Sequence, residues 1–441
     1  MKSAKLSKIW DVLHTSYWFV PTVMAISSVG LAFIMLILDQ KLGSGLVKKL
    51  GWIYTGGPDG ARAVLSTIAG SMITVTGTVF SITIVALSLA SSQFGPRLLR
   101  NFMKDTGNQI VLGTFISTFI YCLLILRTVH GHDYEIFIPQ ISVTVAIILA
   151  MISIGVLIFF IHHAAQSIQA DIVIAEVSND LNQAIDSLFP GKLGHKSSLK
   201  PQQPSPELLA NFDNNYSPIL AQKSGYIQAV DEEKLLKIAK YHNLIIKILQ
   251  RPGNFIIKGS VLVLIFPREF VNKHLIKQIN QIFILGSHRT QQQDVKFTVD
   301  QLVEIAIRAL SPGINDPFTA ISCIDRLSQG LCRLVEREIP SSYRYDENNQ
   351  LRIIANPVTF EGMVDAAFNQ IRQNVSSSVA VRIRLLEALA EIAAHTDNDD
   401  YRQVLMIHSQ MVNQDALERI SEKRDLKDIQ KRYLATLKNL K

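Results

Sequence analysis

A row of hydroxyl side chains runs along one long apolar segment of this 441-residue sequence. Within residues 64–92 they follow one another at spacings of 4, 3, 4, 3, 7 and 4 residues, and only Val85 interrupts the row. The members are Thr67, Ser71, Thr74, Thr78, Ser81, Ser88 and Ser92. A repeat close to 3.5 residues places side chains on one continuous face of a helix.

Two interpretations of this row are open. In the first, small side chains let two helices approach closely, and the hydroxyls bond across the contact or back onto their own helix. In the second, the row lines a path for water, ions or small solutes in an oligomer, because hydroxyls can replace part of a hydration shell. One helix can do both, since Gly70 and Gly77 lie beside the row.

Two arginines follow the row. Gly95 and Pro96 end the helix, and Arg97 and Arg100 then lie three residues apart at the membrane surface. They are typical of residues that anchor a helix end in lipid headgroups. Alternatively, they attract anions to the cytoplasmic mouth of a pore.

A second candidate site is the segment SPGINDP at residues 311–317, which contains Ser311, Asn315 and Asp316. Its Pro-Gly pair breaks the chain, and Asn315 or Asp316 can cap the helix that follows. The segment is therefore either a rigid helix–turn–helix corner or a polar pocket at a helix N-terminus that meets a ligand or partner. The negative charge of Asp316 argues against a phosphate there.

The sequence suggests no metal, cofactor or known catalytic centre. Residues 130–133 (HGHD) have a weak metal-binding spacing and no evident fourth ligand. There is no Gly-Lys-Ser/Thr phosphate loop, no His-Glu-x-x-His and no Gly-x-Ser-x-Gly motif. Three cysteines give no disulfide framework, and Cys323 and Cys332 are expected in a helical core. We expect no cofactor and no enzymatic activity.

The element that carries the hydroxyl row is one of four apolar segments long enough to cross a bilayer. They are residues 18–38, 64–92, 110–126 and 138–161, and none contains Lys, Arg, Asp or Glu. Residues 1–163 hold 11 Lys and Arg against 6 Asp and Glu, whereas residues 164–441 hold 33 against 31. The sequence therefore predicts a multi-pass α-helical membrane domain of four transmembrane helices, followed by a mainly α, partly α+β cytoplasmic domain.

Basic residues near the ends of the apolar segments indicate the orientation. The N-terminus and the second loop are basic, and an even number of spans puts both on the side of the C-terminal half, which predicts cytoplasmic N- and C-termini. The first loop does not fit this orientation, because it is also basic and contains Lys41, Lys48, Lys49 and Arg62. The nearly neutral C-terminal half predicts no nucleic-acid partner.

The chain divides into four predicted parts: a transmembrane domain (1–163), a connecting helix and mobile loop (164–223), a small α+β cassette (224–295) and a helical cytoplasmic domain (296–441). The fourth span is expected to continue as a helix to residue 188, and a loop to occupy 192–223. Strands are expected at 224–230, 243–249, 255–258 and 261–266, around a helix at 232–241 that Asp231 caps.

The last part is expected to be helical throughout. Thr298 and Gln301 have the spacing of a capping box that opens a helix to residue 310. Later helices are expected at 361–373, 378–394, 399–410 and 415–440. Arg382 and Arg384, beside Glu387, are expected to form surface salt bridges or subunit contacts.

Four motifs resemble those of a bacterial family of predicted integral membrane proteins known only as a domain of unknown function. They are residues 18–21 (WFVP), 71–81 (SMITVTGTVFS), 87–97 (LSLASSQFGPR) and 308–317 (RALSPGINDP). The resemblance spans nearly the whole chain, and the two long motifs are specific. It implies a bacterial inner-membrane location and brings no settled activity or catalytic residues.

Two functional hypotheses follow. In the first, the protein is a homo-oligomeric channel or transporter for an ion or small solute; the second span lines the path, and the cytoplasmic half assembles or gates it. In the alternative, the four spans only anchor a scaffold or sensor in the lipid bilayer. Its cytoplasmic half then binds a partner or small ligand around Asn315 and Asp316.

Overall fold

The computed structural model describes residues 16–47, 53–98, 105–130, 137–189 and 203–440. The chain divides into two compact units, Met1–Ile172 and Val173–Lys441, and each is described by itself. Four long apolar helices form the first unit, and a mixed α/β arrangement forms the second. The predicted fold class is therefore confirmed.

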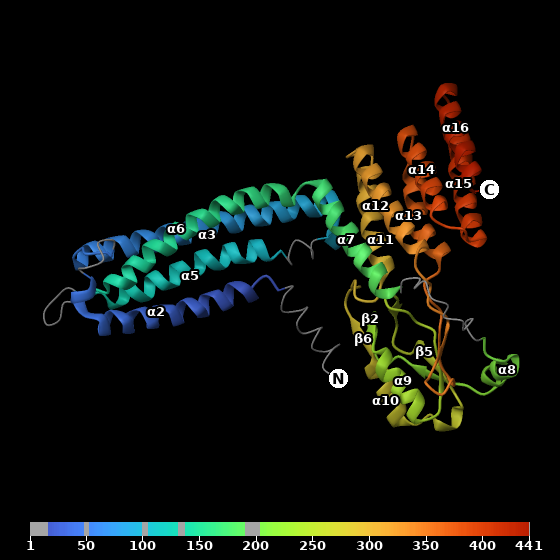
Figure 1. Ribbon diagram of the computed structural model, residues 1–441, viewed down its shortest axis with the longest axis horizontal. Coiled ribbons are helices and arrows are strands. Elements are labelled where there is room, and N and C mark those ends of the chain that lie inside the picture. Colours follow the sequence, from blue (N-terminus) through green and yellow to red (C-terminus); the bar gives the residue numbers. More distant parts are fainter. Residues whose placement is uncertain (1–15, 48–52, 99–104, 131–136, 190–202, 441) are drawn as a thin grey trace. The chain divides into compact units, whose positions relative to one another are not determined.

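The four long helices are α2 (Phe19–Val47), α3 (Pro58–Phe94), α5 (Thr106–Thr128) and α6 (Gln140–Ser167), with the short turn η1 (Pro96–Leu98) after α3 (Figure 1). Each is long and apolar enough to cross a membrane. The 37 residues of α3 span about 55 Å at 1.5 Å per residue, against a bilayer core of about 30 Å. This helix must tilt or extend beyond the hydrocarbon.

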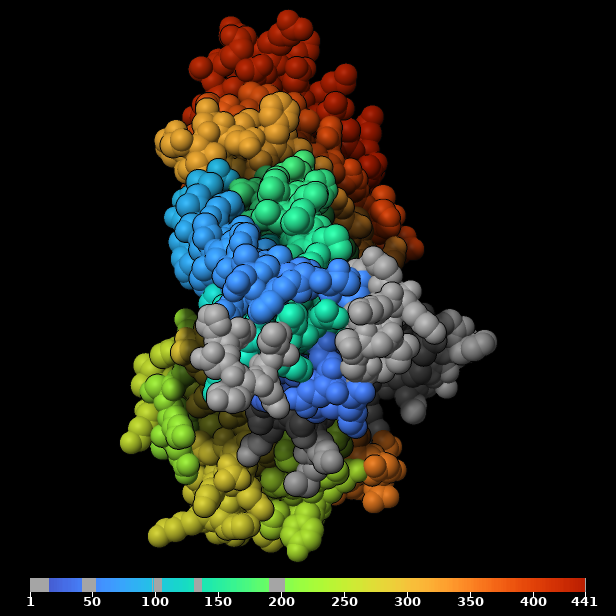
Figure 2. Space-filling model, turned by 90° about the vertical axis from the view of Figure 1, so that its left-hand side faces the viewer, coloured from blue at the N-terminus to red at the C-terminus, as the bar shows by residue number. Residues whose placement is uncertain are grey.

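Helix α5 is the centre of the first unit, because it packs against α2, α3 and α6. Its Val111, Phe115, Tyr121, Cys122 and Ile125 are all buried. Figure 2 views these helices end-on and shows the blue-to-teal atoms gathered in one bundle. The other three helices each bury one face on this core and expose the other.

Two aspartates form hydrogen bonds that connect different helices of this bundle. Asp39, on α2, accepts hydrogen bonds from the backbone N–H of Ile141 (2.8 Å) and Ser142 (2.9 Å), and from the Ser142 hydroxyl (2.5 Å). It therefore caps the N-terminus of α6 from another helix. Asp105 caps α5 through the N–H of Gly107 (2.9 Å), and its Oδ2 lies 2.6 Å from Nε2 of His163 on α6.

The predicted continuous helix over residues 164–188 is interrupted. Helix α6 ends at Ser167, and α7 (Ala170–Leu188) begins two residues after Ile168. The N–H groups of Gln169 and Ile172 bond to the carbonyls three residues before them, at 3.0 and 3.2 Å. These tight turns replace one turn of α-helix and form a joint between the two helices.

The second unit contains two small sheets. The five-stranded sheet has the order β1-β5-β3-β8-β7, and the three-stranded sheet has the order β4-β2-β6. Strands near all four predicted positions are present, as β2 (Gly225–Val230), β3 (Ile245–Ile248), β4 (Phe255–Ile256) and β5 (Val261–Phe266). Asp231 caps α9 (Glu232–Tyr241), as expected. Helices α9 and α10 (Lys273–Ile282) bury Leu235, Ala239, Leu275 and Ile279 in the same apolar core as the strands.

Four further strands were not predicted: β1 (Ser217–Leu220), β6 (Phe283–Gly286), β7 (Tyr343–Tyr345) and β8 (Leu351–Ala355). Strand β1 and helix α8 (Pro206–Asn214) lie in the segment predicted as a mobile loop, so that prediction is wrong there. Ser205 caps α8, because its hydroxyl accepts from the N–H of Leu208 (3.3 Å). Strand β8 pairs in parallel with β3, with Ile353 opposite Ile246, so residues 296–441 are not entirely helical.

Six further helices of this unit, which also contains most of α7 and the short turn η2 (Arg268–Phe270), lie side by side in Figure 1. They are α11 (Val295–Ala309), α12 (Pro317–Val335), α13 (Phe360–Asn374), α14 (Val379–Ala394), α15 (Asp399–Arg419) and α16 (Lys423–Leu440). The predicted capping box at Thr298 is wrong, because Thr298 and Gln301 are buried inside α11. Asp294 caps this helix instead, through the N–H of Phe297 (3.2 Å).

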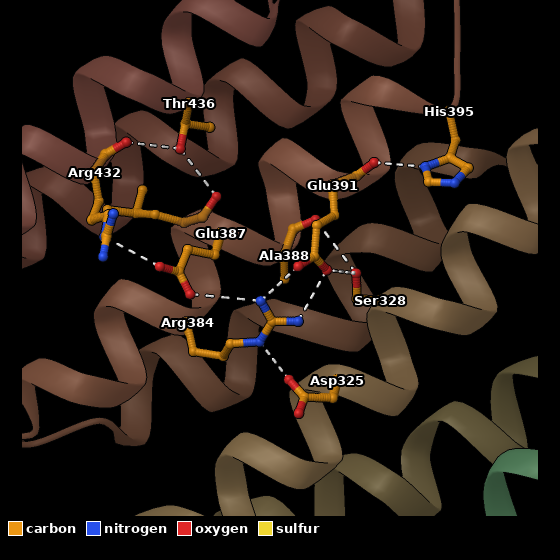
Figure 3. A network of polar contacts seen from close by, with 10 residues as sticks. Asp325, Ser328, Arg384, Glu387, Ala388, Glu391, His395, Arg432 and Thr436 are labelled. Atoms are coloured by element: carbon orange, nitrogen blue, oxygen red, sulfur yellow. Dashed lines mark hydrogen bonds and ion pairs between the residues drawn. The ribbon is translucent and has the colours of Figure 1, made fainter.

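A network of ion pairs joins α12, α14 and α16 (Figure 3). Arg384 donates to both oxygens of Glu391, at 2.8 and 2.9 Å, and also contacts Asp325. The hydrogen bonds to Glu391 raise the pKa of Arg384. The expected salt bridges are therefore present at Arg384.

Arg382 departs from the same expectation, since it is 2% exposed. Its Nη2 donates to the carbonyls of Val375 (2.9 Å) and Ser376 (3.0 Å). Burial lowers the pKa of Arg382. The side chain satisfies carbonyls at the C-terminal end of α13, where a positive charge is favoured.

Candidate functional site

The helix that carries the hydroxyl row, α3, has clear start and stop signals. Pro58 occupies its first turn, where the missing N–H costs nothing. Gly95 ends it with φ of +107° and donates its N–H to the carbonyl of Ser91 (3.2 Å). Pro96 follows and cannot continue the helix. The whole row therefore lies on one uninterrupted helix.

One face of α3 is buried in the bundle. Ala61, Leu65 and Ala69 pack in a cluster with residues of α5 and α6, and Met72 and Val79 pack in a second cluster with Val111, Phe115 and Phe160. Arg62 adds a polar contact at the start of α3, because it donates to the carbonyl of Val129 (3.1 Å). These contacts fix which side of α3 faces outward.

The hydroxyl row lies on the opposite side of the helix, as a rotation of about 100° per residue requires. All seven side chains are exposed, and no other described helix of the chain covers them: Thr67, Ser71, Thr74, Thr78, Ser81, Ser88 and Ser92. Gly70 and Gly77 are exposed beside the row, and a Cβ at either would meet nothing within 4 Å. The structure thus brings the predicted residues together on one outward face, which we call the hydroxyl face.

Several of these hydroxyls donate a hydrogen bond to a backbone carbonyl of their own helix. Thr74 donates to the carbonyl of Gly70 (2.9 Å), Thr78 to that of Thr74 (3.2 Å) and Ser81 to that of Gly77 (2.9 Å). Because the proton points back along the helix, the oxygen lone pairs are left toward the outside. The face therefore offers acceptors, which suit water or a cation better than an anion.

The outward surface of α3 also carries an apolar lane. Ile73, Phe80 and Ile84 are exposed on a side of the helix roughly 100° from the centre of the hydroxyl face. The exposed residues of α6 resemble this lane, since Ile154 and Ile158 are among the large apolar side chains at its surface. The hydroxyl face is mixed, since Val85 (58% exposed) and Leu89 (43%) lie among its hydroxyls, whereas the lane is apolar.

The two arginines at the predicted mouth lie at the edge of what the structure describes. The backbone of Arg97 belongs to η1, and its side chain lies outside the described residues, as does the whole of Arg100. The role of both at a pore mouth stays a prediction.

The predicted corner at Ser311, Asn315 and Asp316 joins α11 to α12. Asp316 accepts from the N–H of Phe318 (3.1 Å) and Thr319 (3.1 Å), and from the Thr319 hydroxyl (2.6 Å). The hydroxyl bond from Thr319 lowers the pKa of Asp316. Asn315 has φ of +50° and lies exposed at the turn, and the Ser311 hydroxyl donates to the carbonyl of Arg308 (2.6 Å). These contacts make a rigid helix–turn–helix corner.

No group of three His, Cys, Asp or Glu side chains among the described residues is placed to hold a metal. Of the HGHD segment, only His130 lies within the described residues. Cys323 is buried on α12 and Cys332 is half-buried there; burial raises the pKa of Cys332 to about 11. Both sulfurs are therefore packing groups rather than reactive thiolates.

The helix after the membrane spans, α7, is firmly held by the second unit. Asp186 accepts from Arg333 at 2.7 and 2.6 Å and from Arg337 at 2.5 Å. The hydrogen bonds from Arg333 lower the pKa of Asp186. Leu181 packs so closely on Gly330 that a Cβ there would lie 2.6 Å from the leucine. Ion pairs and a close packing contact therefore fix α7 to α12.

Sequence reasoning missed Asp39, the Asp105–His163 pair and Asp186. The first two had a usable signal, because Asp39, Asp105 and His163 each lie near the end of an apolar segment. Asp186 had none, since its arginine partners are about 150 residues away in sequence.

Comparison with known proteins finds a family of predicted membrane proteins and several relatives. Residues 14–391 match the family model described as "Predicted membrane protein (DUF2254)". Uncharacterized proteins of Mycobacterium bovis and of Mycobacterium tuberculosis strain H37Rv are each 33% identical to it over 395 residues, which cover 87% of this chain and 73% of the relative. No solved structure matches.

Proposed function

We propose that this chain, which belongs to the DUF2254 family of predicted membrane proteins, acts as a homo-oligomeric channel or transporter in the bacterial inner membrane. In this proposal the hydroxyl face of α3 borders a water-filled path for an ion or small solute. The second unit is cytoplasmic and assembles or gates the path.

One observation carries the proposal: the hydroxyl face lies outward, opposite the buried face of α3. A single chain encloses no path along it, so copies must surround one. The apolar lane at Ile73, Phe80 and Ile84 supplies a separate surface for lipid. A face of oxygen acceptors beside a lane of isoleucine is the pattern expected of a helix with water on one side and hydrocarbon on another.

The contacts of α7 support a gating role for the second unit. The joint at Ile168 and Gln169 connects α6 to a helix that Asp186 fixes to α12. A change in the helices of the second unit would therefore act on the end of a membrane span rather than on a slack linker.

A thiol-labelling experiment in proteoliposomes tests the proposal. Thr74→Cys and Thr78→Cys would be made with Cys332→Ser, since Cys122 and Cys323 are buried. We expect a small soluble thiol reagent to modify both new cysteines and to change solute flux. Ile73→Cys is the matched control on the apolar lane and should stay unreactive.

The outcome against the proposal is equally direct. Protein whose Thr74→Cys and Thr78→Cys sites never react, at any voltage, tension or pH, has a hydroxyl face that does not border water. Absence of flux under the same conditions would leave only an anchored cytoplasmic module.

A second candidate function, a membrane-anchored scaffold or sensor, draws support from the corner at Asp316. The rigid turn presents Phe318 at 78% exposure and Ile314 beside it, and two large apolar side chains on a fixed support suit a partner surface. A pull-down with Phe318→Ala and Asp316→Ala tests this. An unchanged set of partners in both variants would count against the corner.

A further inference from the structure

The last helix, α16, carries a comb of lysines on its outer face. Lys423, Lys427, Lys431 and Lys438 are all exposed, and Leu434 stands among them at 59% exposure. At about 100° per residue these five side chains fall within roughly 80° of the helix circumference. We call this surface the lysine comb.

The opposite face of α16 fixes the helix to its unit. Ile429, Thr436 and Leu440 are buried, and α16 packs against α14 and α15. The Thr436 hydroxyl donates to the carbonyl of Leu386 on α14 (3.1 Å), and Arg432 pairs with Glu387 (3.2 Å). The comb is therefore held outward by a packed helix and not by a loose tail.

The positive charge of the second half is concentrated here. Helix α16 carries six Lys and Arg against two Asp, whereas the remainder of residues 164–441 carries 27 against 29. Among the described residues, no carboxylate forms an ion pair with any lysine of the comb, whereas Arg432 on the inner side is paired. The comb is a local positive surface on an otherwise slightly acidic half.

We propose that the lysine comb docks the second unit onto an anionic lipid surface. The chain is anchored in a bilayer, so headgroups are present at high effective concentration near this unit. Lysines that line one side of a helix, with an apolar residue between them, are the pattern that binds anionic headgroups. No aromatic side chain lies on the comb to stack on bases, which disfavours a nucleic acid.

Lysine acetylation of the full-length protein in nanodiscs tests this. Rates at Lys427 and Lys431 would be read by mass spectrometry in phosphatidylcholine discs and in discs that contain phosphatidylglycerol. We expect acetylation of both to be several-fold slower in the anionic discs, and the protection to vanish at high salt, which screens the charges. Exposed Lys237 and Lys258 should react equally in both.

A pair of matched variants completes the test. In Lys427→Glu/Lys431→Glu protein, protection of Lys423 and Lys438 by anionic lipid should be lost. Lys237→Glu/Lys258→Glu protein has the same change in net charge and should keep it. Equal acetylation in both kinds of disc would overturn the proposal. Protection by an added oligonucleotide and not by phosphatidylglycerol would overturn it in favour of a nucleic-acid partner.

Discussion

Hydroxyl groups are used in opposite ways in two regions of the membrane unit. Between α5 and α6, the hydroxyls of Thr118 and Ser153 lie 3.2 Å apart and both side chains are buried. On α3, Thr74 and Thr78 lie at the outer surface and donate to their own helix. Hydroxyls inside the bundle thus take part in cross-helix hydrogen bonds, as the Ser142 hydroxyl of α6 also does with Asp39 on α2. Thr74, Thr78 and Ser81 of the row bond instead to carbonyls of α3 itself.

The largest effect is expected where a polar group joins two helices from inside the bundle. Asp39→Ala leaves the N–H groups of Ile141 and Ser142 without their acceptor, so the free energy of unfolding in detergent should fall by about 2–4 kcal/mol. Asp59→Ala removes an exposed carboxylate in the first turn of α3 and should cost no more than about 1 kcal/mol. Equal losses of unfolding free energy in the two variants would contradict the view that polar groups inside the bundle stabilise it more than exposed ones.

Adding bulk sharpens the same comparison. Thr118→Phe forces a large ring between α5 and α6 and should lower the free energy of unfolding by about 1–3 kcal/mol. Thr78→Phe places the ring on the outside and should leave thermal unfolding of the detergent-solubilised monomer nearly unchanged. A large loss at Thr78 would mean that the hydroxyl face is packed within the chain.

Removing single hydroxyls should give a smaller contrast. Thr118→Val deletes the contact with Ser153 and should cost about 1 kcal/mol of unfolding free energy. Thr78→Val should cost less than about 0.5 kcal/mol, because its bond to Thr74 is local. Under the proposed function, Thr78→Val changes solute flux and Thr118→Val does not; the reverse result would contradict the assignment.

The smallest effect concerns an exposed ionic contact of the second unit. Arg333 lowers the pKa of Asp186, so the stability that this carboxylate contributes is complete above its ordinary pKa and is lost as pH falls through the lowered value. Since the side chain is 38% exposed, Asp186→Asn should cost at most about 1 kcal/mol near neutral pH.

The measurement is urea unfolding of the two proteins across acidic pH. The difference between them should shrink as pH falls below the lowered pKa. Asp171→Asn removes an exposed carboxylate from the first turn of the same helix and is the control; its effect should be only the small one expected of such a position. A difference that grows toward acidic pH would have the wrong sign.

The features that could be predicted from sequence are those set by local pattern. The four spans follow from runs of apolar residues, and the shared face of the hydroxyl row follows from its 3.5-residue spacing. Asp231 was identified as a cap, and Asp316 as one of two candidates with Asn315, because a cap acts within three residues. Whether the row faces the bundle or its outside depends on where Leu65 and Val79 are buried. The spacing of the residues in the sequence does not predict this.

What could not be predicted depends on partners far apart in the chain. Strand β8 is a five-residue run whose partner, β3, precedes it by about a hundred residues. Thr298 has the right spacing for a capping box, but Asp294 starts the helix one turn earlier and leaves Thr298 in the core. Arg382 looked like a surface residue because its acceptors are backbone carbonyls, which carry no sequence signal.

The parallel pairing of β3 with β8 also sets an order of events during synthesis. Ile246 on β3 can pair with Ile353 on β8 only after residue 353 has been synthesised. The ribosome therefore finishes α11 and α12 before the five-stranded sheet can form. Until then one side of β3 presents unsatisfied amide and carbonyl groups, which invite pairing with another chain. A nascent polypeptide that stops before residue 351 would therefore be a membrane-inserted protein with an open strand edge, and a natural client for chaperones.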